Sequence, residues 1–533
     1  MGITFPCQIN KCPQYTASYC LLPLPSDTKI PRPILRRTIL FKGLSLISFY
    51  ASCLLFYLAR VHLPSRDSLA ACFVSKNVPF VVESSEGWNH KVIPWNVRLN
   101  YTPVAIAIPQ SADQIKAAVS CGIRSGLRVS AKSGGHSFGS YGLGGEDGHL
   151  VIELDRMDRI TLHRDGTARI EPGARLGNVV VELYNQGRRA ISHGSCPGVG
   201  LAGHVLRGGY GIASRLHGLT LDWLIGATVV LADGSSAHCS ATENTDLFWA
   251  VRGAGSSFGI VAEFEFSTFE APNHVTPFTI DLFWNEAQAV EGFEALQDFA
   301  ISAPRELNQW LFMDGASQSI QGVYFGDRNG LDKAIQPFLA RIKAKVSHAS
   351  TMGWIKAHEH FANGENLKQT YSYNSHKTFY GTSLMATAIT KNHIKTFMSA
   401  IFANINDTSA RHSWDFTVAF HGGGASAIAD IDPSATAYVH RDKLLLYQFS
   451  DIETHGQYPE DGFAVLQQFR KSVTDSLDDG KWGMYANYVD TQIDVDTAQK
   501  LYWGRNLLRL QSIKTKLDPN QVFWDPSSIR PLP

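Results

Sequence analysis

Two glycine-rich stretches constrain this chain more than any other feature. The first is RVSAKSGGHS, residues 128–137, and the second is SHGSCPGVGLAGHVLRGGYG, residues 192–211. Each places one nucleophilic side chain, His136 or Cys196, among glycines. Glycine has no Cβ and tolerates positive φ, so its backbone can approach a flat or anionic ligand closely. Successive backbone N–H groups in such a loop also form a nest for phosphate oxygens.

The composition is that of a soluble globular chain, with 44% hydrophobic and 18% charged residues. A length of 533 residues is enough for more than one core. Lys and Arg together number 48, as do Asp and Glu, and this zero net charge argues against a nucleic-acid partner. The eight cysteines have neither CxxC nor zinc-finger spacing, so we expect no metal site.

Both glycine stretches resemble the flavin-binding loops of the berberine bridge enzyme and oligosaccharide oxidase family, whose fold is the vanillyl-alcohol-oxidase type FAD fold. The resemblance runs from about residue 69 to the end. It implies an FAD bonded covalently to His136, at the flavin 8α-methyl carbon, and to Cys196, at ring carbon 6. The other implied cofactor-binding residues are Ser133, Gly134, Gly135, Ser137, Gly200, Gly203, Gly209, Gly211, Ile260 and Val261.

The resemblance also implies a disulfide between Cys72 and Cys121. Such a bridge closes a loop of about 50 residues and contributes a few kcal/mol in the chain-entropy estimate. Two buried thiols are the alternative that the sequence leaves open.

The first 68 residues form an N-terminal region with an apolar run over 38–59. The run is short for a membrane span, and a basic flank precedes it. A cleaved signal, a signal anchor and a wrongly assigned start stay open. All three place the protein in the secretory pathway, either secreted or membrane-anchored. Sequons at Asn100 and Asn406 are compatible with that route.

The rest of the chain predicts an α+β protein with three segments. Residues 69–270 have strands, a helix capped by Ser111 and a hairpin at Asp233-Gly234, and the resemblance makes this a two-subdomain FAD-binding domain of the PCMH type. In residues 271–480, strand-like runs alternate with helical ones, which indicates a substrate domain built on an antiparallel sheet backed by helices. Residues 481–533 contain a strand-like piece and an amphipathic helix, and the family's berberine-type segment here returns to the FAD domain.

The catalytic residue implied by the resemblance is Tyr488, in YANY, which matches the base of the oligosaccharide oxidases. An ordinary phenol, with a pKa near 10, is a poor base at neutral pH. Tyr488 therefore needs its phenolate stabilised by the flavin or by a positive neighbour. Tyr485 is assigned to sheet packing, and Gln448 matches a substrate-facing glutamine.

The predicted substrate pocket departs from the family pattern. The strand before Phe420-His421-Gly422 carries Asp415, Thr417 and Ala419 where the oligosaccharide oxidases have a tryptophan, a glutamine and an aspartate. Ala419 cannot assist Tyr488 as an acid would, and Phe138 replaces a tyrosine. Thr417 and Phe138 remain candidate substrate contacts. A bulged strand could instead bring Trp414 and Asp415 into these roles.

One rival motif is present. Gly198, Gly200 and Gly203 form a GxGxxG, with Asp222 about twenty residues later, as in a dinucleotide-binding fingerprint. Such a fingerprint follows directly on a buried parallel strand, whereas SHGSCP is polar and contains a proline. Arg207 stands where the family has another glycine, and it could alter the flavin edge.

These observations predict an FAD-dependent oxidase that oxidises the reducing-end hydroxyl of an oligosaccharide to a lactone, with molecular oxygen as acceptor and hydrogen peroxide as product. We expect a monomer with no nucleic-acid partner. Oxidation of a phenolic, terpenoid or alkaloid metabolite is the alternative that the less polar pocket favours. A flavin-binding protein with little oxidase activity is a second alternative, because Ala419 leaves the base unsupported.

Overall fold

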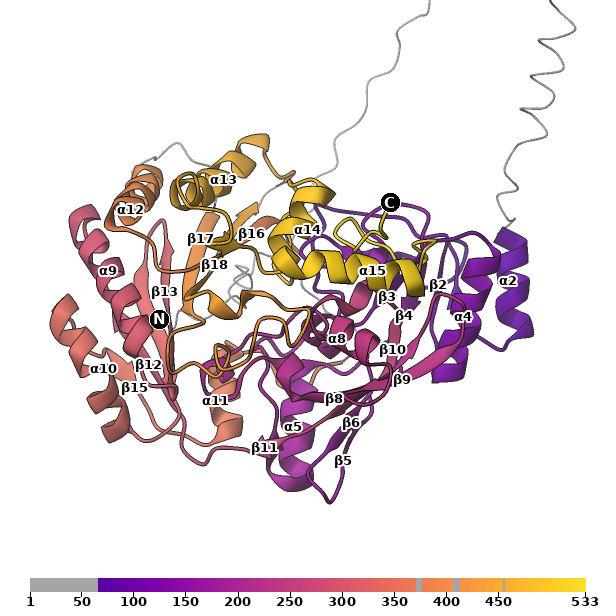
Figure 1. The fold of residues 1–533 in the computed structure, drawn as a ribbon, viewed down its shortest axis with the longest axis horizontal. Helices are drawn as coiled ribbons and strands as arrows, with labels where there is room; N and C mark the ends of the chain where they lie inside the picture. Colours follow the sequence, from indigo (N-terminus) through magenta and orange to yellow (C-terminus); the bar gives the residue numbers. More distant parts are fainter. Residues whose placement is uncertain (1–65, 371–375, 406–412, 454–455) are drawn as a thin grey trace, which may run out of the picture.

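The computed structural model describes residues 66–370, 376–405, 413–453 and 456–533. Three β-sheets of four or more strands, one two-stranded sheet and the helices around them make up this part of the chain (Figure 1). The apolar run over residues 38–59 lies outside it. Among the helices that the structure describes, none has the length and apolar character needed to cross a bilayer.

The first sheet is small and carries the first glycine stretch at its edge. Its strand order is β1-β2-β4-β3, in which β2, β4 and β3 run parallel and β1 is antiparallel to β2. Helix α4 packs against this sheet, and the side chain of Ser111 caps it by accepting the N–H of Gln114, as predicted. The bounds are β1 Phe80–Val81, β2 Ala105–Ala107, β3 Val129–Lys132, β4 Leu150–Glu153, α2 Arg66–Ser75, α3 Trp88–Val92 and α4 Ala112–Arg124.

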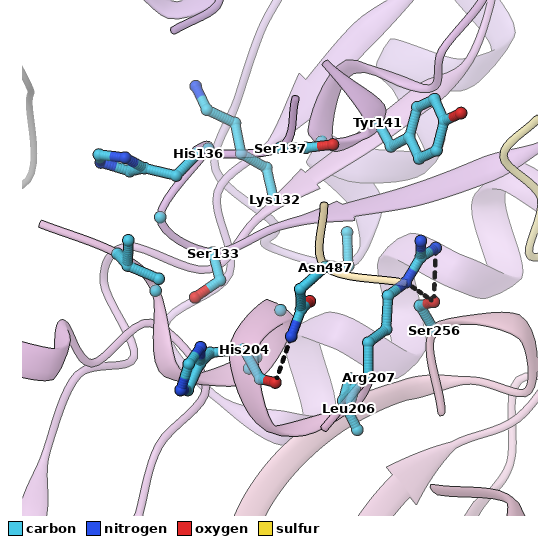
Figure 2. A pocket seen from close by; sticks show the side chains of 18 of the residues that line it. Lys132, Ser133, His136, Ser137, Tyr141, His204, Leu206, Arg207, Ser256 and Asn487 are labelled. Atoms are coloured by element: carbon cyan, nitrogen blue, oxygen red, sulfur yellow. Dashed lines mark hydrogen bonds between the residues drawn. The ribbon is translucent and has the colours of Figure 1, made fainter. Parts of the chain in front are cut away.

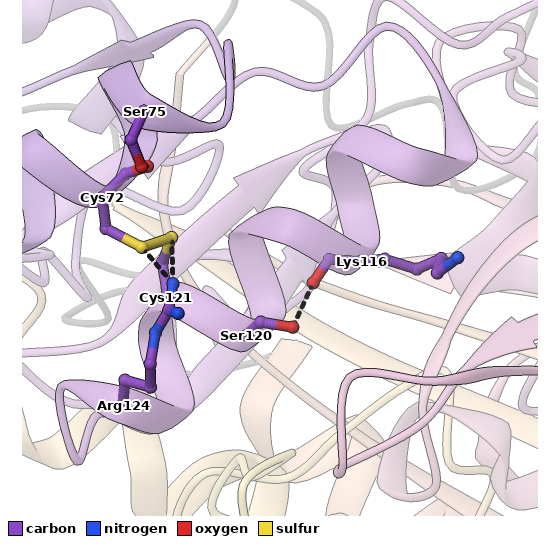
Figure 3. The surroundings of a disulfide bond; sticks show 6 residues. All are labelled: Cys72, Ser75, Lys116, Ser120, Cys121 and Arg124. Atoms are coloured by element: carbon purple, nitrogen blue, oxygen red, sulfur yellow. Dashed lines mark hydrogen bonds between the residues drawn. A yellow bond between two sulfur atoms is a disulfide. The ribbon is translucent and has the colours of Figure 1, made fainter.

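A disulfide joins Cys72 in α2 to Cys121 in α4, with Cα atoms 5.9 Å apart (Figure 3). This confirms the predicted pairing. The bridge fastens the first helix that the structure describes to the core of the first sheet, and the guanidinium of Arg124 lies against its sulfurs.

The second sheet is antiparallel, in the order β5-β6-β10-β8-β9. β8 and β9 form the predicted hairpin, and Gly234 in its turn has φ of +82°. β7 and β11 pair separately. The bounds are β5 Ile160–Leu162, β6 Ala168–Ile170, β7 Arg189–Ala190, β8 Leu224–Val230, β9 Ser236–Ser240, β10 Ile260–Phe266, β11 Phe269–Glu270, α5 Leu176–Gly187, α6 Leu201–Val205, α7 Ser214–His217 and α8 Thr245–Ala254.

The third sheet has eight antiparallel strands in the order β15-β12-β14-β13-β17-β18-β16-β19. Helices α9, α10, α12 and α13 cover one face (Figure 1), where Leu311, Phe416 and Tyr447 join their core. The other face packs on the first part of the chain through Trp310, Ala419 and neighbours. The bounds are β12 Thr276–Asp281, β13 Leu307–Asp314, β14 Gln318–Tyr324, β15 His348–Ala349, β16 Thr378–Ala386, β17 Ser413–Phe420, β18 Leu445–Glu453, β19 Trp482–Gly483, α9 Glu286–Ser302, α10 Arg328–Ile342, α11 Trp354–Phe361, α12 Lys391–Ile405 and α13 Glu460–Thr474.

The end of the chain returns to the first part of the molecule. Helices α14 (Val495–Trp503) and α15 (Leu507–Leu517) pack in the same core as α8, and Val129 donates its N–H to the carbonyl of Val522 at 2.7 Å. The strand-like piece predicted to begin at Tyr485 is wrong. β19 (Trp482–Gly483) ends before it, and residues 484–494 contain turns and irregular backbone but no strand.

Candidate active site

One cavity of about 290 Å³ collects residues from all three sheets. Its walls are the loop after β3, the second glycine stretch, the turn that carries Tyr488 and the C-terminal residues 523–525. Figure 2 shows the first loop, with Ser133 and His136, on one side and the second stretch, with His204 and Arg207, on the other. The predicted site residues that line this cavity are Ser133, Gly134, Gly135, His136, Ser137, Phe138, Cys196, Gly200, Gly203, Gly211, Ile260, Val261, Gln448 and Tyr488.

The two glycine loops touch backbone to backbone at Gly134 and Gly200. A Cβ on either residue would fall on the backbone nitrogen of the other, well inside van der Waals contact. Gly135 has φ of +70°, which also favours glycine. These positions are glycine because the loops could not meet otherwise.

Gly203 differs from its neighbours because nothing in the protein crowds it. A Cβ there would meet no atom within 4 Å, although the residue lines the cavity. Of the predicted site residues, neither Gly209 nor Thr417 is on the cavity wall. Gly209 donates its N–H to the Tyr485 hydroxyl, and Thr417 lies in the sheet opposite Gln448.

His136 lies at the tip of the first loop. Its ring is 5.0 Å from that of Trp95, centroid to centroid, and faces the second loop near Gly198. Burial lowers the pKa of His136 to about 3, with a further contribution from the positive charge of Arg175. The imidazole is therefore neutral at physiological pH, which is the nucleophilic form.

Cys196 is half-buried on the wall of the same cavity, between Ser195 and Pro197. In this structure its sulfur takes part in a disulfide. A sulfur in that state cannot also bond to a cofactor, so attachment at Cys196 requires the free thiol.

Tyr488 closes a tight turn in which its N–H donates to the carbonyl of Tyr485 at 2.9 Å. Its ring stacks on Phe138 at 5.5 Å and meets Tyr485 edge-on at 5.0 Å. Burial, and then the neighbouring hydroxyls of Tyr485 and Tyr210, raise the pKa of Tyr488 above its ordinary value. The surrounding described residues therefore supply no charge that would stabilise its phenolate.

Gln448 lies on the wall of the cavity. Its side chain is 3% exposed, and its Oε1 accepts no hydrogen bond from the part of the chain that the structure describes. A buried acceptor without a partner is costly, and such groups often mark ligand contacts. This makes Gln448 the residue of the large sheet best suited to meet a substrate.

The bulged-strand alternative for Trp414 and Asp415 is wrong. β17 keeps one continuous register with β13 and β18. Trp414 packs on Phe469 on the helix-covered face, away from the cavity. Asp415 lies on the other face, where Ser450 donates to it at 2.8 Å. Burial, and beyond it the charges of Asp314 and Asp451, raise the pKa of Asp415 to about 7.

The dinucleotide fingerprint is also wrong for this chain. No parallel strand leads into Gly198, because β7 has two residues and pairs antiparallel with β11. Asp222 is not available to a ribose. It is buried and takes both guanidinium nitrogens of Arg441, at 2.6 and 2.8 Å.

Arg207 lines the cavity but is fully engaged by the protein. It pairs with Asp525 at 2.7 Å and donates to Ser256, Ser527 and the carbonyl of Ala486. The residue thus ties the second glycine stretch to the turn before Tyr488 and to the C-terminal segment. The sequence singled out its position but not this bonding.

Several cavity residues were missed by sequence reasoning. Trp95, Lys132, Tyr141, Ser256, Asn487 and Asp525 line the wall. They come from five separate segments, and no local pattern distinguishes them from packing residues. Asn487 could have been suspected only from its place beside Tyr488.

Comparison with known proteins supports one assignment. The family model described as "FAD binding domain" matches residues 103–240, and the one described as "Berberine and berberine like" matches residues 484–530. These two regions hold the glycine loops and the Tyr488 turn.

Relatives cover nearly the whole length that the structure describes. The chain is 47% identical to chitooligosaccharide oxidase of Gibberella zeae over 87% of this chain and 95% of the relative. It is 46% identical to the FAD-linked oxidoreductase dpmaF of Metarhizium anisopliae over 88% and 92%. A structure of glucooligosaccharide oxidase from Acremonium strictum, whose FAD is described as 6-S-cysteinyl, 8α-N1-histidyl, superposes with a TM-score of 0.85 at 46% identity, over 87% of this chain and 99% of that one.

The fold and the site therefore define an α+β FAD-linked oxidoreductase of the PCMH type. The chain belongs to the berberine bridge enzyme-like family, beside its oligosaccharide oxidases.

Proposed function

We propose that this protein is an FAD-dependent oxidase that oxidises a hydroxyl at the reducing end of an oligosaccharide to a lactone, with oxygen as acceptor and hydrogen peroxide as product. The observation that carries the proposal is the convergence of His136, Cys196, Tyr488 and Gln448 on one cavity. Relatives named as oligosaccharide oxidases support the same chemistry.

The residues of the cavity fit FAD. Gly203 leaves open space at the wall, and the loop Ser133–Ser137 offers backbone N–H groups to phosphate oxygens. His136 would hold the flavin by a covalent bond, which its neutral imidazole favours, and Cys196 would hold it by a second bond as a free thiol. When bound, FAD supplies the two-electron oxidant that no side chain of the protein provides.

Tyr488 acts as the base in this proposal and takes the proton of the substrate hydroxyl. Since its protein neighbours raise the pKa of Tyr488, the stabilising influence must come from the bound cofactor or substrate. Gln448 offers its Oε1 as an acceptor to a second substrate hydroxyl, and Phe138 packs beside the base.

The supporting features extend to location and domain organisation. The disulfide Cys72–Cys121 fits an oxidising compartment, which supports a secreted protein. Residues 69–270 and 481–533 together would form the FAD-binding domain, and 271–480 the substrate domain. We take the protein to be a monomer.

A panel of cello-, malto-, xylo- and chito-oligosaccharides, assayed for hydrogen peroxide, tests the activity. Turnover of any of them supports the proposal. If no sugar gives hydrogen peroxide, the proposal is contradicted and the second candidate, oxidation of a phenolic or terpenoid metabolite, is favoured. The ring stack of Phe138 on Tyr488 makes the cavity wall beside the proposed base less polar, and the name of the relative dpmaF does not mention a sugar. If phenolic and terpenoid metabolites also give no hydrogen peroxide, the remaining candidate is a flavin-binding protein with little oxidase activity.

A further inference from the structure

The turn that carries Tyr488 lies beside the edge of the large sheet without being part of it. β19 pairs with β16 only at Met385 and Ala386. Further along the same edge of β16, the chain leaves the backbone ladder and forms the turn from Tyr485 to Tyr488. Strand pairing therefore does not fix the position of the catalytic side chain.

A single hydroxyl takes the place of the missing ladder. Ser383 is fully buried on the cavity face of β16. Its Oγ accepts the N–H of Tyr485 at 3.0 Å. The same oxygen lies 3.3 Å from the carbonyl of Tyr488 and 3.4 Å from that of Tyr485, the two acceptors within reach of its own proton. The serine side chain thus contacts both ends of the turn.

The turn is anchored on its other side by the hydroxyl of Tyr485. That oxygen accepts the N–H groups of Gly209 and Tyr210, at 2.9 and 3.0 Å, from the second glycine stretch. Asn487 adds a bond from its amide to the carbonyl of His204 at 3.0 Å (Figure 2). With both sides held, the backbone of Tyr488 has one position relative to the sheet and the glycine loops.

The pairing of β16 with β18 also places Ser383 beside a candidate substrate-binding residue. Ser383 is the direct cross-strand partner of Gln448, which lines the cavity and whose Oε1 accepts no hydrogen bond from the residues that the structure describes. The same row of the sheet therefore carries the group that fixes the base and the group that offers itself to the substrate.

We infer that Ser383 is a positioning residue for Tyr488: its side chain, rather than a β-ladder, holds the catalytic turn against the large sheet. This inference rests on the proposed function, in which Tyr488 is the base. Misplacing a reacting group by about 1 Å can cost about a hundredfold in rate.

The test compares Ser383→Ala with Thr276→Val in the FAD-loaded protein. Thr276 is also fully buried in the large sheet; its hydroxyl donates to the carbonyl of Gly326 at 2.7 Å and lies 2.9 Å from the hydroxyl of Thr351. The control therefore loses a similar bond on β12, with four strands of the sheet between it and β16. Amide hydrogen exchange of a peptide covering residues 484–490 reads the turn directly. We expect faster exchange in Ser383→Ala and wild-type exchange in Thr276→Val.

Kinetics then separate positioning from general weakening. We expect Ser383→Ala to lower kcat about tenfold or more while KM changes by less than about threefold. In the Tyr488→Phe background the same substitution should change the residual rate by less than about twofold, because the side chain that it positions is already lost.

Unchanged exchange over residues 484–490 in Ser383→Ala would overturn the inference. So would an equal loss of kcat with and without the Tyr488 hydroxyl. If the wild-type protein oxidised no sugar, the proposed function would fail, but the exchange measurement would still decide whether Ser383 holds the turn.

Discussion

The ring of Tyr488 lies face to face with the ring of Phe138, with centroids 5.5 Å apart and planes inclined by 14°. Phe138 directly follows the first glycine loop, and Tyr488 belongs to the C-terminal segment. The stack therefore joins the loop that holds His136 to the turn that carries the proposed base. It also removes water from one face of the phenol, which contributes to the burial that raises the pKa of Tyr488.

The pH dependence of turnover follows from this stack. A base works only in its deprotonated form, and burial favours the protonated phenol. We expect kcat/KM to rise with pH from neutral into the alkaline range. Tyr488→Phe should lose about a hundredfold or more in kcat and also lose this rise, with flavin content unchanged. Peroxide assays at a series of pH values check both; a variant that keeps most of its turnover would exclude Tyr488 as the base.

Gly200→Ala and Gly203→Ala should fail in different ways. A methyl at residue 200 collides with the backbone of Gly134, so we expect a large loss of thermal stability. A methyl at residue 203 meets no protein atom, so that variant should fold with nearly the wild-type Tm but take up less FAD. Tm and the ratio of flavin to protein absorbance measure the two effects. Full FAD content in a stable Gly203→Ala variant would show that the cofactor does not approach this wall.

The covalent attachments predict a pattern in denatured protein. Acid precipitation of the wild type should leave the yellow colour with the polypeptide. His136→Ala and Cys196→Ala should each retain colour through the remaining bond, and the double variant should release it. Peptide mass spectrometry identifies the attached residue. A Cys196 peptide found in a disulfide, with no flavin on it, would leave His136 as the single attachment.

The carboxyl of Asp415 gives a stability prediction whose sign is fixed by its pKa. Because folding raises this pKa from 3.8 to about 7, the folded state binds a proton that the unfolded state releases. The resulting stability is complete below about pH 4 and is lost as the pH rises to about 7. Asp415→Asn should therefore gain Tm relative to wild type across this window and no further above it. Thermal melts of both proteins from pH 3.5 to pH 8.5, in steps of about 0.5 around the two pKa values, check this. A constant difference in Tm would contradict it.

Local pattern was enough for much of the fold. The Ser111 cap, the hairpin at Gly234 and the glycine loops each follow from a short run of residues, because turns and caps depend on nearest neighbours. The pairing of Cys72 with Cys121 came from family resemblance, since two cysteines alone do not specify a bond.

The Tyr488 turn shows where pattern reasoning ends. Its aromatic residues predict a strand, with Tyr485 packed on a sheet. The ring of Tyr485 does lie in the core shared with the large sheet, but no strand forms there, and its hydroxyl accepts backbone N–H groups of the second glycine stretch. The backbone groups bound by Tyr485 lie 276 and 275 positions away in the chain, and Arg207 reaches Ala486 at 279 positions. Such contacts depend on how the sheets pack together, and hydrophobic periodicity in the sequence does not predict them.

The mutual contact of Gly134 and Gly200 has a further consequence. Two loops that brace each other through main-chain atoms keep their separation whether or not a cofactor lies between them. The folded apoprotein would then contain a preformed cofactor site, and flavin would bind after folding and would not be needed for folding. An insertion in either loop would displace the backbone of the other, so we expect the two segments to change in evolution only as a pair.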